Sequence, residues 1–367
     1  MRNRIAYVLV LGAACTPNTT GNTSGTDAGR AVADASVDAN LTQAPPPEWA
    51  NVTSNLAGMA SECGNLTMVS SRPNSTMIIA GVAHRGLFAT TDAGATWNPL
   101  GTGSGGAEII NRPSSIVYDP DHTDTFWESG IYSGGGVFRT DDGGTTFSQL
   151  GDVSHDDLVA VDLTDPARQT LLAGGHEQTQ TLHRSTDGGS TWNNVGANLP
   201  ADTNFSSDPL MISAAIHLVG VCGWGAGECG IWRTTDGGQS WTQVSDQGGT
   251  FAPQRTADGT IWWPIYNGGM LVSTDAGASW SVAVQGTVNG IEPMVLPDGR
   301  LVSIGGDHLM ISSDGKSWSQ IGQTLPYAPA GVSYSARTKT FFVWHWDCGT
   351  VVLADAIMRA GFDYLTE

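Results

Sequence analysis

One short motif occurs six times in this sequence at nearly regular intervals. Each copy has a Ser or Thr, an Asp two positions later, then a glycine-containing turn and an aromatic residue. The copies read TTDAGATW, TDDGGTTF, STDGGSTW, TTDGGQSW, STDAGASW and SSDGKSW. Their aspartates are Asp92, Asp142, Asp187, Asp236, Asp275 and Asp314, with separations of 50, 45, 49, 39 and 39 residues. Such a period indicates a repeat architecture and matches one four-stranded propeller blade.

Each copy of the motif predicts a tight turn between two strands. Alternating apolar runs such as GLFAT, GVFRT and GIWRT precede the motif and are typical of strands. Glycine tolerates the positive φ that such turns require, and the Asp carboxylate accepts hydrogen bonds from backbone N–H groups. The terminal aromatic residue then begins the returning strand. We therefore interpret the six aspartates as turn-forming residues rather than as metal ligands or catalytic groups.

The motif resembles the Asp-box of sialidases, sortilin-type receptors, xyloglucan-hydrolysing enzymes and a photosystem assembly factor. Five copies match in full length, with Phe147 replacing Trp in one, and the sixth is one residue short. In those families the box joins the third and fourth strands of a blade. The resemblance thus implies an all-β fold, a seven-bladed β-propeller of four-stranded blades. The six blades that carry a box are expected at Asn65–Leu100, Ser115–Leu150, Leu158–Val195, Leu210–Val244, Ala252–Val284 and Ile291–Ile321.

The seventh blade is predicted to combine the two ends of the domain. Gly331–Phe362 contains three strand-like runs without a box, and a three-stranded blade would leave one edge unpaired. The segment EWANVTSNL at Glu48–Leu56 resembles TWNNVGANL, which follows the third box. We therefore expect Trp49–Thr53 to be the fourth strand of blade seven. The alternative is that Trp49 is a stray aromatic residue at the domain edge.

The chain begins with features of a secretory signal over residues 1–15. Arg2 and Arg4 precede a short apolar run, and small residues then lead to Cys15. This start resembles a bacterial lipoprotein signal, which implies acylation of Cys15; an ordinary secretory signal is the alternative. Residues 16–47 are poor in large apolar side chains and are expected to form a disordered tether. Residues 48–367 are expected to form the propeller, either held at the cell envelope by a lipid anchor or secreted.

Composition narrows the set of partners. Net charge is −19, with 35 acidic and 16 basic residues, so the surface repels phosphate backbones and nucleic acid is excluded as a partner. Contact with a membrane is expected only through the lipid anchor. We expect a monomer that uses no cofactor.

Four cysteines remain once Cys15 is assigned to the anchor. Cys222 and Cys229 bracket a short loop, while Cys63 and Cys348 fall in loops that the propeller arrangement makes neighbours. We expect disulfides Cys222–Cys229 and Cys63–Cys348 in an oxidising compartment, although sequence alone allows three pairings. A zinc site is the rival interpretation, because His345 is close to Cys348; the lack of a Cys-x-x-Cys motif weighs against it.

The propeller face opposite the boxes carries most of the candidate functional residues. Loops between second and third strands share this loop-rich face with the blade-to-blade connections, and Tyr132, Asp157, Glu177 and Asp208 are among its polar residues. The candidate ligand-binding residues are His84, Arg85, Arg112, His176, Trp224, Tyr266, His308, His345 and Trp346. The candidate catalytic residues are Glu108, His155, Asp156 and Glu292. Rings beside carboxylates and imidazoles suit sugar recognition, but loops also collect polar residues by default.

Two functions follow from this face. The first is a non-catalytic propeller that binds a glycan or a surface protein. The alternative is a glycan-degrading enzyme, either a glycoside hydrolase with paired carboxylates or a polysaccharide lyase in which His with Tyr or Arg removes a proton next to a uronic carboxylate. No Arg-Ile-Pro segment of the sialidase type occurs, which argues against sialidase activity. Fold-level resemblance alone does not decide between the two.

Overall fold

The computed structural model describes residues 48–61, 66–132, 135–223, 227–345 and 356–361. The chain divides into two units, Met1–Ala44 and Pro45–Glu367, and the described residues belong to the second. The expected signal over residues 1–15, including Cys15, and the whole expected tether over residues 16–47 lie outside the described residues. Among the described residues, no helix is both long and apolar enough to cross a membrane.

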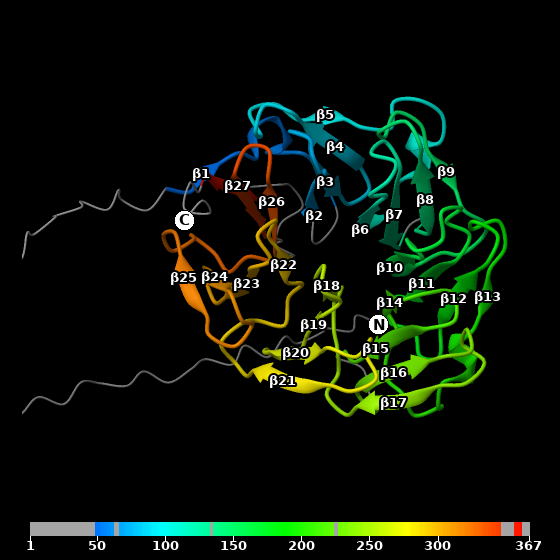
Figure 1. Cartoon of the computed structure of the whole chain (residues 1–367). Coiled ribbons are helices and arrows are strands. Elements are labelled where there is room, and N and C mark those ends of the chain that lie inside the picture. Colours follow the sequence, from blue (N-terminus) through cyan, green and yellow to red (C-terminus); the bar gives the residue numbers. More distant parts are fainter. Residues whose placement is uncertain (1–47, 62–65, 133–134, 224–226, 346–355, 362–367) are drawn as a thin grey trace, which may run out of the picture. The chain divides into compact units, whose positions relative to one another are not determined.

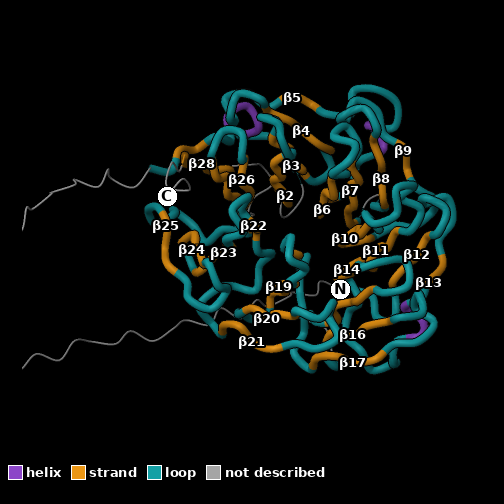
Figure 2. The backbone as a smooth tube through the Cα atoms, in the orientation of Figure 1, coloured by secondary structure: helices purple, strands orange, loops and turns teal. Residues whose placement is uncertain are grey.

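The second unit is a seven-bladed β-propeller, as the repeat predicts. Its strands form seven antiparallel sheets of four strands each, and Figure 1 shows the first strands of the blades around the centre and the fourth strands at the rim. The tube in Figure 2 shows the strands joined by loops and turns, with very little helix. Within the described ranges the helices are three single 3-10 turns, η1 (Ser54–Leu56), η2 (Gly106–Glu108) and η3 (Gly196–Asn198).

Each blade contributes one strand to each of four concentric positions. The innermost strands are β2 (Leu66–Ser71), β6 (Arg112–Tyr118), β10 (Asp156–Val161), β14 (Asp208–Met211), β18 (Gln254–Arg255), β22 (Met294–Val295) and β26 (Gly331–Ser335). The second strands are β3 (Ile78–Val82), β7 (Phe126–Ile131), β11 (Leu171–Gly175), β15 (His217–Val221), β19 (Ile261–Pro264), β23 (Leu301–Gly305) and β27 (Thr340–Trp344). The third strands are β4 (Gly86–Thr90), β8 (Val137–Thr140), β12 (Leu182–Ser185), β16 (Gly230–Thr234), β20 (Met270–Ser273), β24 (His308–Ser312) and β28 (Ile357–Gly361). The outermost strands are β5 (Asn98–Pro99), β9 (Ser148–Gln149), β13 (Asn193–Asn194), β17 (Thr242–Ser245), β21 (Ser281–Val284), β25 (Ser319–Ile321) and β1 (Ala50–Asn51).

The repeated motif forms the same hydrogen-bonded turn in every blade that carries it. In the first copy, Thr90 Oγ1 donates to Asp92 Oδ1 (2.6 Å) and accepts from the Gly94 N–H (3.0 Å), while Asp92 Oδ1 accepts from the Thr96 N–H (2.9 Å). The other five copies repeat these bonds. Hydrogen bonds to the carboxylates lower the pKa values of all six aspartates. These bonds account for the aspartates as parts of the turns.

The apolar core lies between adjacent blades. One cluster joins Met68, Ile79 and Leu87 of the first blade to Phe126 and Phe138 of the second, and all five side chains are buried. Equivalent clusters follow around the ring. Because each sheet is covered on both faces by its neighbours, removal of one blade would expose the two blades beside it.

The seventh blade closes the ring in the predicted way. Strand β1 pairs antiparallel with β28, with Ala50 opposite Arg359 and Asn51 opposite Met358. The pairing extends beyond the strand, because the Val52 N–H donates to the Ile357 carbonyl (2.8 Å) and the Ile357 N–H donates to Thr53 Oγ1 (2.9 Å). Residues from the two ends of the domain thus share one four-stranded sheet.

Candidate functional site

The first strands line a cavity along the propeller axis with a volume of about 580 Å³. Every blade contributes, from β2, β6, β10, β14, β18, β22 and β26. Ser114, Ser115, Gln254 and Glu292 are among the polar lining residues. The structure corrects the expected placement of Arg112, Asp156, Asp157 and Asp208, which begin the first strands β6, β10 and β14 instead of lying in connecting loops. First strands line the cavity, so these residues occur at the loop-rich ends of cavity-lining strands.

Three aromatic rings from blades two and three pack together on the loop-rich face; we call Tyr132, His155 and His176 the ring cluster. Tyr132 follows β7, His155 precedes β10, and His176 follows β11. The ring centroids are 4.9 Å apart for Tyr132 and His155, 5.1 Å for Tyr132 and His176, and 4.9 Å for the two histidines. The backbone also connects the loops, because the His176 N–H donates to the His155 carbonyl (2.8 Å). The structure therefore brings together two of the predicted residues, His155 and His176, and adds Tyr132.

A continuous hydrogen-bonded chain runs through His176. Its Nδ1 is 2.8 Å from Asp157 Oδ1 and 2.9 Å from Oδ2, and its Nε2 is 3.0 Å from the Tyr132 hydroxyl. Since an ionised carboxylate only accepts, Nδ1 carries a proton toward Asp157. In the neutral imidazole, Nε2 is then an acceptor and takes the Tyr132 O–H. Glu177 Oε1 lies 3.2 Å from the same Nε2, so it competes with Tyr132 when the ring is charged.

His155 is held in the opposite tautomer. The Tyr132 backbone N–H donates to His155 Nδ1 at 3.0 Å, so the proton of a neutral His155 resides on Nε2. Burial lowers the pKa of His155, and the neighbouring His176 acts in the same direction. The ring cluster therefore contains one imidazole whose pKa is lowered and one that faces two carboxylates.

A cation lies on the other side of Tyr132. The Arg112 guanidinium carbon is 5.0 Å from the Tyr132 ring centroid, in the range of a cation–π interaction. Arg112 is the first residue of β6, the innermost strand of blade two, and β10 is the innermost strand of blade three. Arg112 is thus a predicted residue that the structure places at the ring cluster.

The backbone at this site is strained at three positions. Tyr132, His155 and Glu177 have φ values of 57°, 66° and 54°, which place all three in the left-handed region. Non-glycine residues in this region cost about 1 kcal/mol or more each and concentrate at functional sites. The strain is maintained by the surrounding fold and fixes the directions of the three side chains.

Buried carboxyl groups lie beside the ring cluster. Asp156 is completely buried, and its Oδ1 is 3.6 Å from His183 Nδ1. Burial raises the pKa of Asp156 and raises that of Asp208 well above the ordinary value; the charge of Asp157 adds to the second effect. A backbone hydrogen bond from Phe251 acts in the other direction on Asp208. Asp156 is therefore an internal group of the fold, not a catalytic residue open to solvent.

Phe251 supplies an exposed aromatic surface next to Asp208. Its side chain is 47% exposed, which is unusual for a phenylalanine, and its φ is 56°. The sequence gives little sign of this, because Phe251 stands alone in a glycine-containing connection between blades four and five. It is a candidate stacking surface that the sequence analysis did not identify.

The remaining predicted residues are spread around the face. Glu108 is exposed at the end of η2. Glu292 lines the central cavity. The surrounding protein removes much of its hydration and raises its pKa to about 7. Gln254 Nε2 donates a hydrogen bond to its carboxyl group at 2.8 Å. His308 contacts Asp307 (2.6 Å) and Thr324 (3.0 Å), and the His345 ring packs against Tyr327 with centroids 3.9 Å apart and the ring planes tilted by 48°.

Three further predicted residues make hydrogen bonds to backbone carbonyls of neighbouring segments. The His84 N–H donates to the Asn111 carbonyl (3.0 Å), and the Tyr266 N–H donates to the Gly248 carbonyl (3.2 Å). Arg85 Nε donates to the Ala60 carbonyl (2.7 Å). Trp224 and Trp346 lie outside the described residues. Within the described ranges, no group of three or more His, Cys, Asp or Glu side chains is arranged to hold a metal ion.

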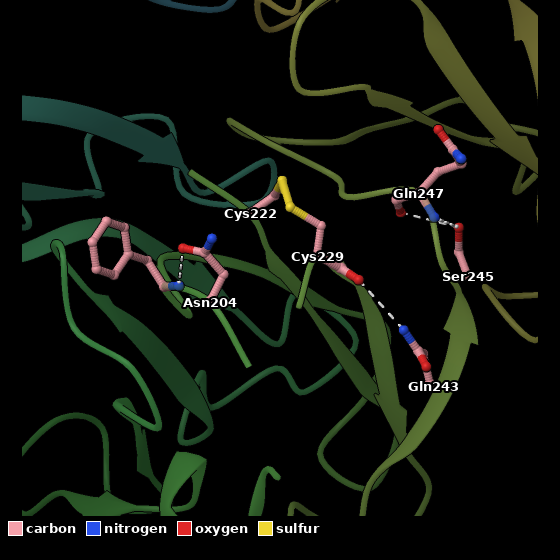
Figure 3. Close-up of a disulfide and its surroundings, with 7 residues drawn as sticks. Asn204, Cys222, Cys229, Gln243, Ser245 and Gln247 are labelled. Carbon is pink, nitrogen blue, oxygen red and sulfur yellow. Dashed lines mark hydrogen bonds between the residues drawn. A yellow bond between two sulfur atoms is a disulfide. The ribbon is translucent and has the colours of Figure 1, made fainter. Parts of the chain in front are cut away.

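A disulfide joins Cys222 to Cys229 in blade four. Figure 3 shows this bond and, next to it, the hydrogen bond from Gln243 Nε2 to the Cys229 carbonyl (3.4 Å). It closes the loop between β15 and β16 on the loop-rich face. Cys63 and Cys348, the second expected pair, lie outside the described residues.

Comparisons with known proteins agree on the propeller. No model of a known protein family matches the chain. Over 152 residues it is 27% identical to the photosystem II assembly lipoprotein Ycf48 of Synechococcus sp. (strain CC9902), covering 40% of this chain and 43% of that protein. Over 247 residues it is 23% identical to a xyloglucanase of Paenibacillus sp, covering 53% of this chain and 23% of the enzyme. The matched parts thus span less than half of either relative.

Solved structures of the same two kinds are similar to this chain. The GH74 enzyme of Niastella koreensis superposes with a TM-score of 0.60 at 15% identity, covering 83% of this chain and 53% of that one. Ycf48 bound to a D1 peptide superposes with a TM-score of 0.57 at 14% identity, covering 88% and 98%. At such low identity the likeness shows the fold alone, a seven-bladed β-propeller.

Proposed function

We propose that this propeller binds a glycan or a protein segment at the cell envelope, through the part of its loop-rich face that contains the ring cluster. One observation carries the proposal: Tyr132, His155 and His176 converge from two blades with Arg112 and Asp157 around them. Rings offer stacking surfaces, and the charged groups offer hydrogen bonds of fixed direction. The relatives fit both ligand classes, since one is a xyloglucanase and another is a structure bound to a peptide.

The test is a binding screen followed by a matched pair of variants. The purified protein is applied to a glycan array and to a peptide array, and any ligand found is measured by calorimetry. Tyr132→Ala is expected to weaken binding by tenfold or more, because removal of an aromatic anchor costs about 1.4 kcal/mol or more of binding free energy. The control is His122→Ala, which removes an exposed ring in the β6–β7 loop, away from the loop-rich face. Equal affinity of Tyr132→Ala and the unmodified protein would refute the proposed location.

A glycan-degrading enzyme is the second candidate, and the hydrogen-bonded chain Asp157–His176–Tyr132 favours it. A base that holds the proton of a second side chain, and is itself oriented by a third group, is a common catalytic arrangement. Hydrolysis by two free carboxylates fits less well, because Asp157 and Glu177 are both engaged with His176. Release of shortened glycan from a bound ligand is the readout that separates this candidate from binding alone.

A further inference from the structure

We propose that Tyr132 is a catalytic acid and base that cleaves a uronate-containing glycan by β-elimination. The proposal rests on the second candidate function and specifies its reaction and substrate class. The observation behind it is the position of the Tyr132 hydroxyl, 3.0 Å from His176 Nε2, with the Arg112 guanidinium over the same ring. Elimination needs a base, an acid and a group that stabilises charge on the substrate carboxyl group. This small region supplies all three.

Asp157 and His176 position the hydroxyl and control its proton. Asp157 binds Nδ1 through both carboxylate oxygens, which fixes the ring and directs Nε2 toward Tyr132. When Nε2 takes the Tyr132 proton, the resulting imidazolium lies between Asp157 and the phenolate, and both neighbours stabilise it. The charged or titratable groups facing His176 are Asp157 on β10, Glu177 after β11, His155 before β10 and Tyr132 after β7. His176 and Asp157 are therefore positioning residues in this proposal.

The reaction balances with no further reactant. The Tyr132 phenolate takes the proton from the substrate carbon that bears the carboxyl group. The electron pair left behind forms a double bond to the adjacent carbon, and the bond from that carbon to the glycosidic oxygen breaks. The departing oxygen then takes the proton back from Tyr132, and the phenolate is restored. The products are an unsaturated uronate end and a new reducing end, and the protein is unchanged.

Charge favours the esterified, uncharged form of the uronate. The chain carries a net charge of −19, and Asp157 and Glu177 both belong to this region, so a polyanion is repelled as it approaches. An ester is neutral, and it acidifies the adjacent proton more than a carboxylate does. The Arg112 guanidinium then provides hydrogen bonds to the ester carbonyl as negative charge develops on it. The exposed Phe251 ring offers a stacking surface for a neighbouring sugar.

The experiment is an ultraviolet assay for the unsaturated product. The purified protein is incubated with methyl-esterified polyuronates, with the same polymers after ester removal, and with neutral β-glucans. Rising absorbance and products of the expected mass are predicted for the esterified polymers, with slower turnover of the free acids. Tyr132→Phe is expected to reduce kcat by about a hundredfold or more, the usual range for an acid–base group.

Matched variants separate catalysis from folding. His176→Gln and Asp157→Asn should lower kcat, change its pH profile and leave KM nearly unchanged. His122→Gln is the control, because His122 Nδ1 also lies beside a carboxylate, 3.2 Å from Asp119 Oδ2, but in the β6–β7 loop, away from the ring cluster. Full activity of Tyr132→Phe, with circular dichroism showing a folded protein, would overturn the role of Tyr132. Binding of glycans without any unsaturated product would overturn elimination and leave the binding function intact. Absence of unsaturated product together with no binding on the glycan and peptide arrays would refute the proposed function as well.

Discussion

The indole N–H of Trp97 donates to the backbone carbonyl of Val52 at 2.9 Å, across a sequence separation of 45 residues. Trp97 ends the first repeat, and Val52 follows strand β1 of the seventh blade, so the bond joins the first blade to the last. The same bond joins Trp192 to Leu150 and Trp241 to Val195, in each case reaching the preceding blade. Val52 thus occupies the place that Leu150 and Val195 hold elsewhere, which identifies Val52 as part of a normal blade junction.

The first prediction concerns closure of the ring. A chain that starts at Gly58 loses β1, which leaves β28 unpaired, and it also loses Val52 and Leu56, which are 6% and 0% exposed. Burial of two such side chains contributes about 1.5–3 kcal/mol each, so the melting temperature is expected to fall by several degrees or more. Calorimetry of this chain, beside one that starts at Glu48, is the measurement. Equal melting temperatures would show that β1 contributes nothing to closure.

The second prediction concerns the turn glycine that packs on Val52. Gly94 has a φ of 90°, and a Cβ there would lie 2.7 Å from Val52 Cβ. Gly94→Ala therefore combines backbone strain with overpacking and is expected to destabilise the fold by about 2–4 kcal/mol. The control is Gly299→Ala, with a φ of 87° and no atom within 4 Å, which should cost about 1–2 kcal/mol. Urea unfolding of both variants tests whether overpacking against Val52 adds to the destabilisation that the turn conformation alone causes.

The third prediction concerns a buried ion pair between blades two and three. Arg168 binds Asp119 through two nitrogens, at 2.8 and 3.0 Å, and their side chains are 4% and 1% exposed. Lysine cannot form this fork, so Arg168→Lys should destabilise the protein by about 1–3 kcal/mol. Arg139→Lys is the control, because the Arg139–Asp141 pair is largely exposed at 33% and 63% and should change stability by less than about 0.5 kcal/mol. A similar loss in both variants, measured by denaturant unfolding, would contradict the importance of burial.

Much of the fold could be predicted from the sequence because the repeat is a local pattern. The turn at Asp92 is encoded within a few residues, and the spacing of the aspartates then sets the number of blades. Closure could be predicted because Trp49–Leu56 resembles the segment after the third repeat, and Asn55 and Asn198 both donate to the following turn, to the Trp97 and Gly238 carbonyls.

The candidate site was less predictable because it depends on contacts between loops. The sequence places His155 and His176 on one face, but it does not show that their rings pack together or that a left-handed Tyr132 packs against both. Nor does it show that Asp156 points into the protein while Asp157, the next residue, binds His176. Adjacent residues on a strand face opposite ways, and one step in register decides which carboxylate is available. Phe251 had no motif to mark it.

The last prediction concerns the pH dependence of stability. Glu128 is completely buried on β7, where burial raises its pKa to about 8, although Asn111 Nδ2 donates to it at 3.1 Å. The ordinary glutamate pKa of about 4.5 holds in the unfolded chain. Between these values the native state binds the proton that the unfolded state has lost, so the contribution of Glu128 is full below pH about 4.5 and declines as pH rises toward about 8.

Glu128→Gln isolates this effect, because glutamine stays neutral and still accepts from Asn111. The variant is expected to be more stable than the unmodified protein by about 1–3 kcal/mol at neutral pH, and the difference should shrink toward zero near pH 4.5. Denaturant unfolding at a series of pH values is the measurement. A stability difference that does not vary between pH 5 and pH 8 would show that Glu128 is ionised in the native state. In the Asn111→Ala background the difference should be at least as large, because the hydrogen bond donated by Asn111 lowers the pKa of Glu128 and its loss leaves the effect of burial unopposed.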